Sequence, residues 1–237
     1  MTNRQKEDRL NETLKNPNEN HSTEISRMID DTIKNKHKVY CATDWHLYRR
    51  KEKGSTSCDK RTDFNEIISN LKIIKPDDLL INLGDLVDGE FKDKELLKNI
   101  ILPMNFKKIL VLGNNDIFDT SFYKSCGFDY VVKSFVWNNV VFSHMPIKND
   151  NQINVHGHIH DSKQYWISYS NQIDVAYLNG RKKPIELMDV IKTQPIYSKI
   201  IKECPEHFDE AYIMHLDTNI FNTTMRDSII IEDPFDN

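Results

Sequence analysis

The spacing of hydrophobic residues changes along the chain and divides it into segments of different structure. Four apolar residues near the start recur at intervals of three and four: Ile25, Met28, Ile29 and Ile33. This spacing predicts an amphipathic helix that Ser22 caps and that packs against the main domain. We therefore expect residues 1–36 to form a helical N-terminal appendage.

From residue 38 onward, short apolar runs alternate with longer amphipathic segments. Three of the short runs predict buried strands: Lys38–Thr43, Asp78–Leu83 and Lys107–Leu112. Between them, Asp63–Ile74 and Asp93–Ile101 have the spacing of helices. Strands that alternate with helices predict βαβ units and a parallel sheet.

The pattern after residue 128 is typical of strands joined by tight turns. Two pairs of segments predict β-hairpins: 131–137 with 140–143, and 165–170 with 172–176. Asn138 and Asn139 lie between the first pair, as a two-residue hairpin turn requires. Pro184 is well placed in the first turn of a predicted helix that ends at Lys192.

Composition and charge indicate a globular protein with a distinct C-terminal end. The chain is 38% hydrophobic and 29% charged, and it has no run of ~18 apolar residues that would span a membrane. We expect no secretory leader and, because the four cysteines are scattered, a reducing cytoplasm. Residues 196–237 hold nine acidic and three basic side chains, which predicts an acidic appendage after a main domain at 37–195.

Polar residues follow each of the three predicted parallel strands. Asp44 and His46 follow the first strand, Asp85 follows the second, and Asn114 follows the third. The carboxyl ends of parallel strands lie at the edge of an open sheet where ligands bind. In an extended chain, residues two apart point the same way, so we expect Asp44 and His46 to share one face.

Histidines supply the second half of the candidate site. Five of the nine histidines lie in short motifs after apolar runs: His46, His144, His156, His158 and His160. If residues 155–160 are extended, their three imidazoles crowd onto one face. Neutral imidazole is the commonest metal ligand, so this crowding predicts a metal site.

Oxygen and nitrogen donors of this kind suit Mn²⁺, Fe, Zn²⁺, Co²⁺ or Ni²⁺. Seven of them exceed the number that one tetrahedral zinc accepts: Asp44, His46, Asp85, Asn114, His144, His158 and His160. Two divalent ions that share a carboxylate account for the number. Such a pair, ~3.5–4 Å apart, holds a hydroxide and binds a phosphoryl group.

The ordered motifs Asp-x-His, Gly-Asp-x-x-Asp, Gly-Asn-x-Asp, a single His and Gly-His-x-His resemble the calcineurin-like metallophosphoesterase superfamily over roughly residues 38–192. The segment around residues 142–161 is similar to its small bacterial and phage phosphohydrolase branch. The resemblance implies a four-layer α/β/β/α sandwich with two central mixed β-sheets.

The resemblance also implies roles for the residues, with Mn²⁺ as the expected ion. One metal would bind Asp44, His46 and His160, the other would bind Asn114, His144 and His158, and Asp85 would bridge the two. A metal-bound hydroxide would attack phosphorus. Asp88 would hydrogen-bond to one of the metal ligands and orient it without binding the metal itself.

Two positions depart from the family pattern. Many relatives have a proton-donating His after the ligand Asn, with the next acid supporting it, whereas this chain has Asn115 and Asp116. Asn115 donates a hydrogen bond but transfers no proton, so a metal-bound water or His156 would have to serve. The residues after His46 also differ from those of the branch, and they include Arg49. In this chain Arg49 either binds phosphate or lies in a solvated loop.

These observations leave three classes of function open. The first is an enzyme that hydrolyses a phosphomonoester or phosphodiester, with a nucleotide or another small phosphorylated molecule as its substrate. The second is a scaffold that keeps the fold without catalysis, and the third is a nuclease. A net charge of −4 argues against binding duplex nucleic acid. The appendages could mediate homo-oligomer contacts, and we expect no membrane partner.

Overall fold

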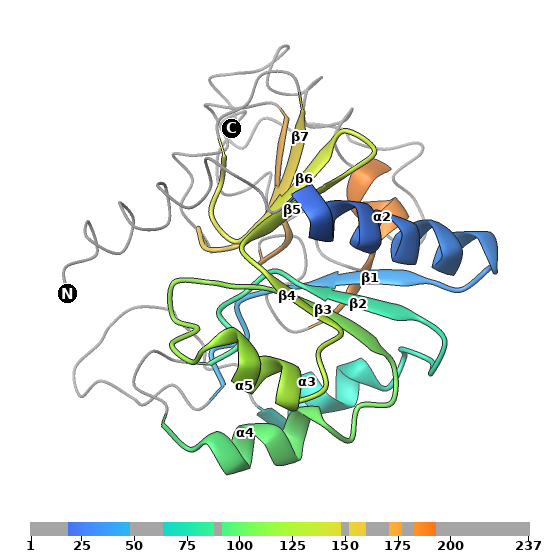
Figure 1. Ribbon diagram of the computed structural model, residues 1–237. Helices are drawn as coiled ribbons and strands as arrows, with labels where there is room; N and C mark the ends of the chain where they lie inside the picture. The colour runs from blue at the N-terminus through green and yellow to red at the C-terminus, as the bar shows by residue number, and fades with distance from the viewer. Residues whose placement is uncertain are drawn as a thin grey trace, which may run out of the picture.

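Two mixed β-sheets pack against each other to form the body of the protein (Figure 1). The structure is a computed structural model that describes residues 19–47, 64–87, 92–147, 152–159, 171–176 and 183–192. Within this part of the chain, one sheet has five strands and the other has four. Each combines parallel and antiparallel pairs, which confirms the predicted α/β fold with two mixed sheets.

The larger sheet has the strand order β4-β3-β2-β1-β9. Its strands are β1 (Val39–Ala42), β2 (Leu79–Asn82), β3 (Lys107–Val111), β4 (Tyr130–Val132) and β9 (Ile185–Glu186). Strands β1 to β4 are parallel, and β9 runs antiparallel to β1. Strands β1, β2 and β3 confirm the three predicted strands to within one residue at each end.

Three helices cover the outer face of the larger sheet: α3 (Phe64–Leu71), α4 (Lys94–Ile101) and α5 (Thr120–Ser125). Leu80 and Leu110 point from the sheet into a core that Ile67 and Leu97 complete from the helices. Asp93 caps α4, because its carboxylate accepts the backbone N–H of Leu96 at 3.0 Å. The two predicted helices in this region are therefore confirmed.

The smaller sheet has the order β5-β6-β7-β8. Its strands are β5 (Ser134–Trp137), β6 (Val140–Ser143), β7 (Ile153–His156) and β8 (Gln172–Asp174). The predicted hairpin between β5 and β6 is confirmed, with φ of 44° at Asn138 and 66° at Asn139. A two-residue turn with two positive φ angles matches the twist of the strands that it joins.

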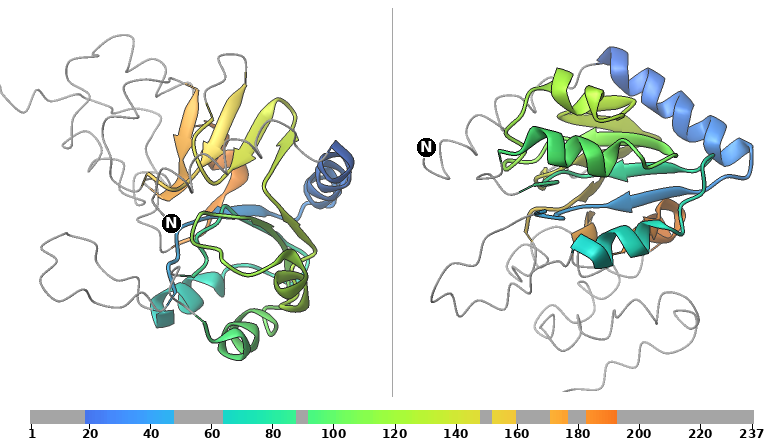
Figure 2. Two further views of the ribbon diagram at one scale, coloured as in Figure 1. Left: turned by 60° about the vertical axis from the view of Figure 1, so that its left-hand side comes forward. Right: turned by 90° about the horizontal axis from the view of Figure 1, so that it is seen from below.

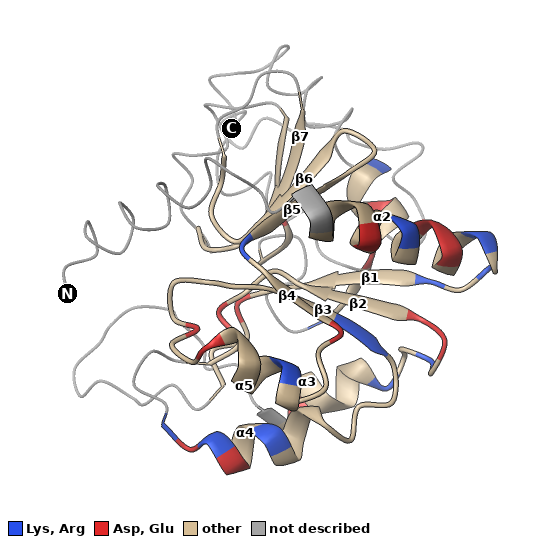
Figure 3. Ribbon diagram, viewed as in Figure 1, with Lys and Arg blue, Asp and Glu red and all other residues tan. Residues whose placement is uncertain are grey.

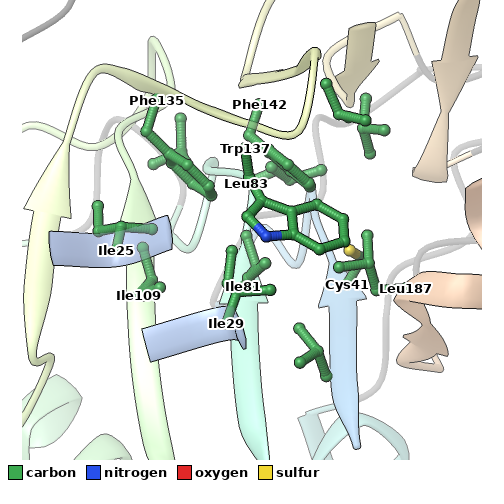
Figure 4. Close-up of a cluster of buried hydrophobic side chains, with 14 of the residues drawn as sticks. Ile25, Ile29, Cys41, Ile81, Leu83, Ile109, Phe135, Trp137, Phe142 and Leu187 are labelled. Carbon is green, nitrogen blue, oxygen red and sulfur yellow. The ribbon is translucent and has the colours of Figure 1, made fainter. Parts of the chain in front are cut away.

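The space between the sheets is filled by apolar side chains from both of them (Figure 4). Ile81 and Ile109 point from the larger sheet toward Phe135 and Phe142 of the smaller one. The rings of Phe135 and Phe142 stack with their centroids 4.6 Å apart. This core fixes the two sheets relative to each other, and with them the loops at their strand ends.

Helix α2 (Glu19–Lys34) packs beside the edge strand β5 and closes one side of the core between the sheets (Figure 2). Ile25 and Ile29 are fully buried there, whereas Ile33 is 37% exposed. The helix begins before Ser22, so Ser22 is not its cap. The hydroxyl of Ser26 donates to the carbonyl oxygen of Val136 at 3.0 Å, which satisfies a backbone group on the free edge of β5.

Charged residues lie on the side of α2 that faces away from the core, and α4 also carries charged residues of both signs (Figure 3). Glu24, Arg27, Asp31 and Lys34 of α2 are all exposed. The amphipathic pattern predicted for this helix is therefore confirmed. Among the described residues, no helix is both long and apolar enough to cross a membrane.

Three details differ from the sequence prediction. The segment 131–137 is two strands, because Val132 pairs with Val111 of β3 while Ser134 pairs with Ser143 of β6. The chain thus changes sheets at Lys133. Residues 185–186 pair with β1 as a strand, and the helix expected from Pro184 occupies only residues 187–192.

The second predicted hairpin and the outermost layer are described only in part. Strand β8 pairs in parallel with β7, and the segment 165–170 predicted to pair with it lies outside the described residues. The described residues form three of the four expected layers: the helices α3 to α5 and the two sheets.

Candidate metal centre

The loops after five strands bring the predicted ligands together. Asp44 and His46 follow β1, Asp85 follows β2, and Asn114 follows β3. His144 follows β6 and His158 follows β7, both in the smaller sheet. The site therefore lies where the carboxyl ends of the strands in the two sheets meet, as the position of the motifs predicts.

Most of these ligands have an unusual backbone conformation. The φ angles are 54° at Asp44, 42° at His46, 52° at Asp85 and 71° at His158. Non-glycine residues adopt this left-handed region at a cost, and such residues cluster at functional sites. The extended chain that we assumed for Asp44 and His46 is therefore wrong, although the two side chains still meet.

Hydrogen bonds between neighbouring loops stabilise these conformations. The backbone N–H of Asp44 donates to Gly84 O at 2.9 Å, and that of His46 donates to Asp85 O at 2.9 Å. The carboxylate of Asp116 accepts the backbone N–H groups of Asp85, Leu86 and Gly113 at 2.8–3.0 Å. These bonds tie the loop after β2 to the loops after β1 and β3.

Close packing explains the glycines of the motifs. A Cβ atom at Gly113 would overlap the backbone nitrogen and the carboxylate of Asp85. A Cβ atom at Gly157 would overlap the hydroxyl of Thr43 and the carboxylate of Asp44. Only glycine lets the ligand loops approach each other this closely.

The side chains form two groups of potential metal ligands that share Asp85. One group is Asp44, His46 and Asp85, and the other is Asp85, His144 and His158. Within each group the ligand atoms lie within 4.8 Å of one another. Nε2 of His46 is 3.6 Å from Oδ2 of Asp85, and Nε2 of His144 is 3.4 Å from Oδ1 of Asp85. Each oxygen of Asp85 thus faces a different group.

Asn114 belongs with the second group. Its Oδ1 lies 3.0 Å from Nε2 of His144, which in turn lies 3.2 Å from Nδ1 of His158. Nδ1 of His144 donates to the carbonyl oxygen of Leu83 at 2.8 Å. That bond turns Nε2 toward Asn114 and Asp85, as a metal-binding imidazole requires.

The donor set fits divalent cations. Asp44 and Asp85 are 0% and 1% exposed, and burying two adjacent carboxylates is costly without compensating positive charge. Burial opposes ionisation of both Asp85 and His144, but their mutual attraction lowers the pKa of Asp85 and raises that of His144. The cluster therefore favours positive charge between its carboxylates, where the two groups would hold metal ions.

Asn115 and Asp116 lie beside the shared carboxylate. The backbone N–H and the side-chain Nδ2 of Asn115 donate to Oδ1 and Oδ2 of Asp85, at 2.8 and 2.6 Å. Burial and the neighbouring Asp85 carboxylate raise the pKa of Asp116 to about 6. Both residues hold Asp85 and its loop in place, and their roles in proton transfer stay predictions.

His156 lies at the end of β7. It is 2% exposed, and its Nδ1 donates to the carbonyl oxygen of Gly157 at 2.9 Å. It belongs to neither ligand group among the described residues. The extended conformation on which the predicted crowding of three imidazoles depends ends at His158, whose φ is 71°. Burial lowers the pKa of His156 to about 4.

Three predicted site residues, Arg49, Asp88 and His160, lie outside the described residues. Sequence reasoning in turn missed Thr43, whose hydroxyl donates to Oδ2 of Asp44 at 2.7 Å. It also missed Asn154, which holds the loop around His144. The only signal for either was a polar residue in or next to an apolar strand.

Comparisons with known proteins identify the family of the chain. The model of the calcineurin-like phosphoesterase family matches residues 37–222. No curated protein matches the chain. A protein of unknown function from Aquifex aeolicus is 25% identical, with 65% of this chain and 98% of that chain covered and a TM-score of 0.46. The nuclease MPE from Pseudomonas putida is 18% identical, with 52% and 61% covered and a TM-score of 0.38.

Proposed function

The chain belongs to the calcineurin-like phosphoesterase family, and from that premise we propose that it is a metal-dependent phosphoesterase. Its reaction is the hydrolysis of a phosphomonoester or phosphodiester at a centre of two divalent cations. The observation that carries this proposal is the carboxylate of Asp85, which both ligand groups share.

The residues divide between the two cations by their contacts. His46 faces one oxygen of Asp85 and lies beside Asp44. His144 faces the other oxygen and lies beside Asn114 and His158. When bound, a pair of cations supplies a nucleophilic water at neutral pH and positive charge for the phosphoryl oxygens. Mn²⁺ is the first ion to test, followed by Fe, Zn²⁺, Co²⁺ and Ni²⁺.

The chain's own residues prepare this centre before any ion binds. The hydroxyl of Thr43 and the backbone N–H of His158 both donate to Oδ2 of Asp44, at 2.7 and 2.9 Å. Asp44 is thus fixed with its other oxygen 3.7 Å from Nε2 of His46. Such preorganised donors need little rearrangement during the reaction.

For the substrate we propose a small phosphorylated molecule such as a nucleotide. The net charge of −4 disfavours a broad phosphate-binding surface, whereas a small phosphoester needs only the local positive charge of the centre. A scaffold without activity and a nuclease are the alternative outcomes of the test.

The test starts from chelated, dialysed protein. Each divalent ion is added back, its stoichiometry is measured, and hydrolysis is followed on monoesters, diesters, cyclic phosphoesters and single-stranded oligonucleotides. We expect two ions per chain and hydrolysis of small esters that depends on them. Two bound ions without hydrolysis of any ester would identify a scaffold, and hydrolysis of oligonucleotides alone would identify a nuclease.

A further inference from the structure

A buried amide stands in the middle of the smaller sheet. Asn154 lies between Ile153 and Val155 on β7 and is 1% exposed, and its register partner on β6 is Val141. A polar side chain is costly at such a position unless its hydrogen bonds are made. The partners of this amide therefore indicate its purpose.

All of the side-chain bonds of Asn154 go to β6 and to the loop that carries His144. Nδ2 donates to Val141 O at 3.1 Å and to Oγ of Ser143 at 2.9 Å, and Oδ1 accepts the backbone N–H of Ile147 at 2.7 Å. The hydroxyl of Ser143 in turn donates to Met145 O at 2.7 Å. These bonds hold the chain on both sides of His144.

A second amide completes the arrangement. Gln172 is the register partner of Asn154 on β8, and its Nε2 donates to Ile147 O at 3.1 Å. The two amides thus hold the N–H and the C=O of the same residue. The Oε1 atom of Gln172 is buried without a hydrogen-bond partner among the described residues. An unpaired buried acceptor costs stability, so fold stability alone does not favour Gln172 here.

We propose that Asn154, assisted by Gln172, is a positioning residue for His144 and thereby sets the affinity of the cation held by His144 and His158. The loop fixes where Nε2 of His144 lies relative to Asn114 and Asp85. Asp44 and His46 come from the other sheet, after β1. The inference rests on the proposed two-cation centre and adds that β7 and β8 of the smaller sheet set the position of one of its ligands, His144.

The test compares Asn154→Leu and Gln172→Leu with the unaltered chain. Leucine fills the space of either amide but makes none of its hydrogen bonds. Thr32→Val is the matched control, because it removes one partly buried hydrogen bond, from Thr32 Oγ1 to Met28 O at 2.7 Å, in helix α2, which carries none of the proposed ligands. Mn²⁺ isotherms give the affinity of each ion, and electron paramagnetic resonance separates a coupled pair from a single ion.

We expect Asn154→Leu to lower the affinity for one of the two Mn²⁺ ions about 10–100-fold. At limiting Mn²⁺ the signal of the coupled pair should then disappear. Its isotherm should resemble that of His144→Ala and differ from that of His46→Ala. Gln172→Leu should lower the affinity for the same ion by a smaller factor. It should do so without loss of thermal stability, because it also removes an unpaired acceptor. Thr32→Val should keep both affinities.

Several results would overturn the inference. If Asn154→Leu and Thr32→Val lower the affinities for both ions by the same factor, the amide of Asn154 acts only through the stability of the fold. If Asn154→Leu does not fold, unchanged affinities in Gln172→Leu would refute the role of the network. If the unaltered chain binds no pair of ions, the proposed function itself fails and this inference falls with it.

Discussion

Asn115 holds the carboxylate of Asp85 by two hydrogen bonds, one from its backbone N–H to Oδ1 and one from its side-chain Nδ2 to Oδ2. The residue that stands where many relatives have a proton donor therefore fixes the orientation of the shared ligand. Its side chain points at Asp85 in the candidate metal centre, so a different residue at position 115 would act directly on that centre.

Asp85→Asn should remove both ions and nearly all activity. The carboxylate offers a charged oxygen to each group, whereas the amide has one neutral acceptor. Its NH₂ group is a donor and would face either the N–H donors of Asn115 or the ring nitrogen of a histidine. We expect a fall in kcat/KM of about 10³-fold or more, with less than one tightly bound ion per chain. Stoichiometry after dialysis and rates on an aryl phosphodiester check this. Near-normal turnover with both ions bound would show that the site is wrongly assigned.

Gly157→Ala should disturb the Asp44 half of the centre. The new Cβ would overlap the hydroxyl of Thr43 and the carboxylate of Asp44, neither of which is the end of a long flexible side chain. We expect a lower melting temperature and weaker binding of the ion held by Asp44 and His46. Both are measured by thermal unfolding with and without Mn²⁺.

Gly127→Ala is the matched control for Gly157→Ala. Gly127 has a φ of 93°, so alanine is strained there as well, but its nearest neighbours are Leu102 and Lys108. It should lower the melting temperature and leave both metal affinities unchanged. Equal loss of affinity in the two variants would indicate a general effect of instability.

The sequence predicted which residues the strand ends bring together better than it predicted the connections between strands. The strand-end motifs could be found because β1, β2 and β3 are short apolar runs with polar residues directly after them. The change of sheet at Lys133 could not, because residues 130–137 are apolar enough to pair with either neighbour. Only tertiary pairing, with Val111 on one side and Ser143 on the other, divides them.

Backbone geometry explains the remaining errors at the site. Side-chain alternation in an extended strand placed His156 with His158, but the chain leaves the strand after His156 and turns through a positive φ at His158. No periodicity predicts such a turn in a residue other than glycine. Asn154 was missed because one polar residue in a strand usually faces solvent, and because its partners, on β6 and in the loop after it, are set by the pairing of β6 with β7.

Ile29→Ala should destabilise the protein far more than Ile33→Ala, although both lie on α2. Ile29 is fully buried in the core between the sheets, whereas Ile33 is 37% exposed. We expect a loss of about 2–5 kcal/mol in the free energy of unfolding for Ile29→Ala and well under half of that for Ile33→Ala. Chemical denaturation with circular dichroism measures both. Equal effects would mean that α2 does not dock as the structure places it.

The last prediction concerns how the leaving group is protonated. Nitrophenolate departs without a proton, whereas an alkoxide needs one as its bond to phosphorus breaks, and general acid catalysis contributes about 10²–10⁴-fold. The amide of Asn115 is too weak an acid to transfer a proton. His156 is buried with its Nδ1–H donated to Gly157 O. We therefore expect the rate to fall steeply as the pKa of the leaving group rises, and to fall just as steeply in His156→Ala.

Asn115→His should flatten this dependence by raising the rate on alkyl esters, because it places an acid next to Asp85. Asp116 already accepts three backbone N–H groups, so the new imidazole would have to be oriented chiefly by Asp85 and by the substrate itself. Asn115→Ala is the control: it also loses the bond to Oδ2 of Asp85 but supplies no acid, so it should slow every ester alike. A wild-type series that is already shallow and becomes steep in His156→Ala would identify His156 as the acid. A series that is flat in all four proteins would instead make a water molecule the proton source, because no side chain tested would then contribute.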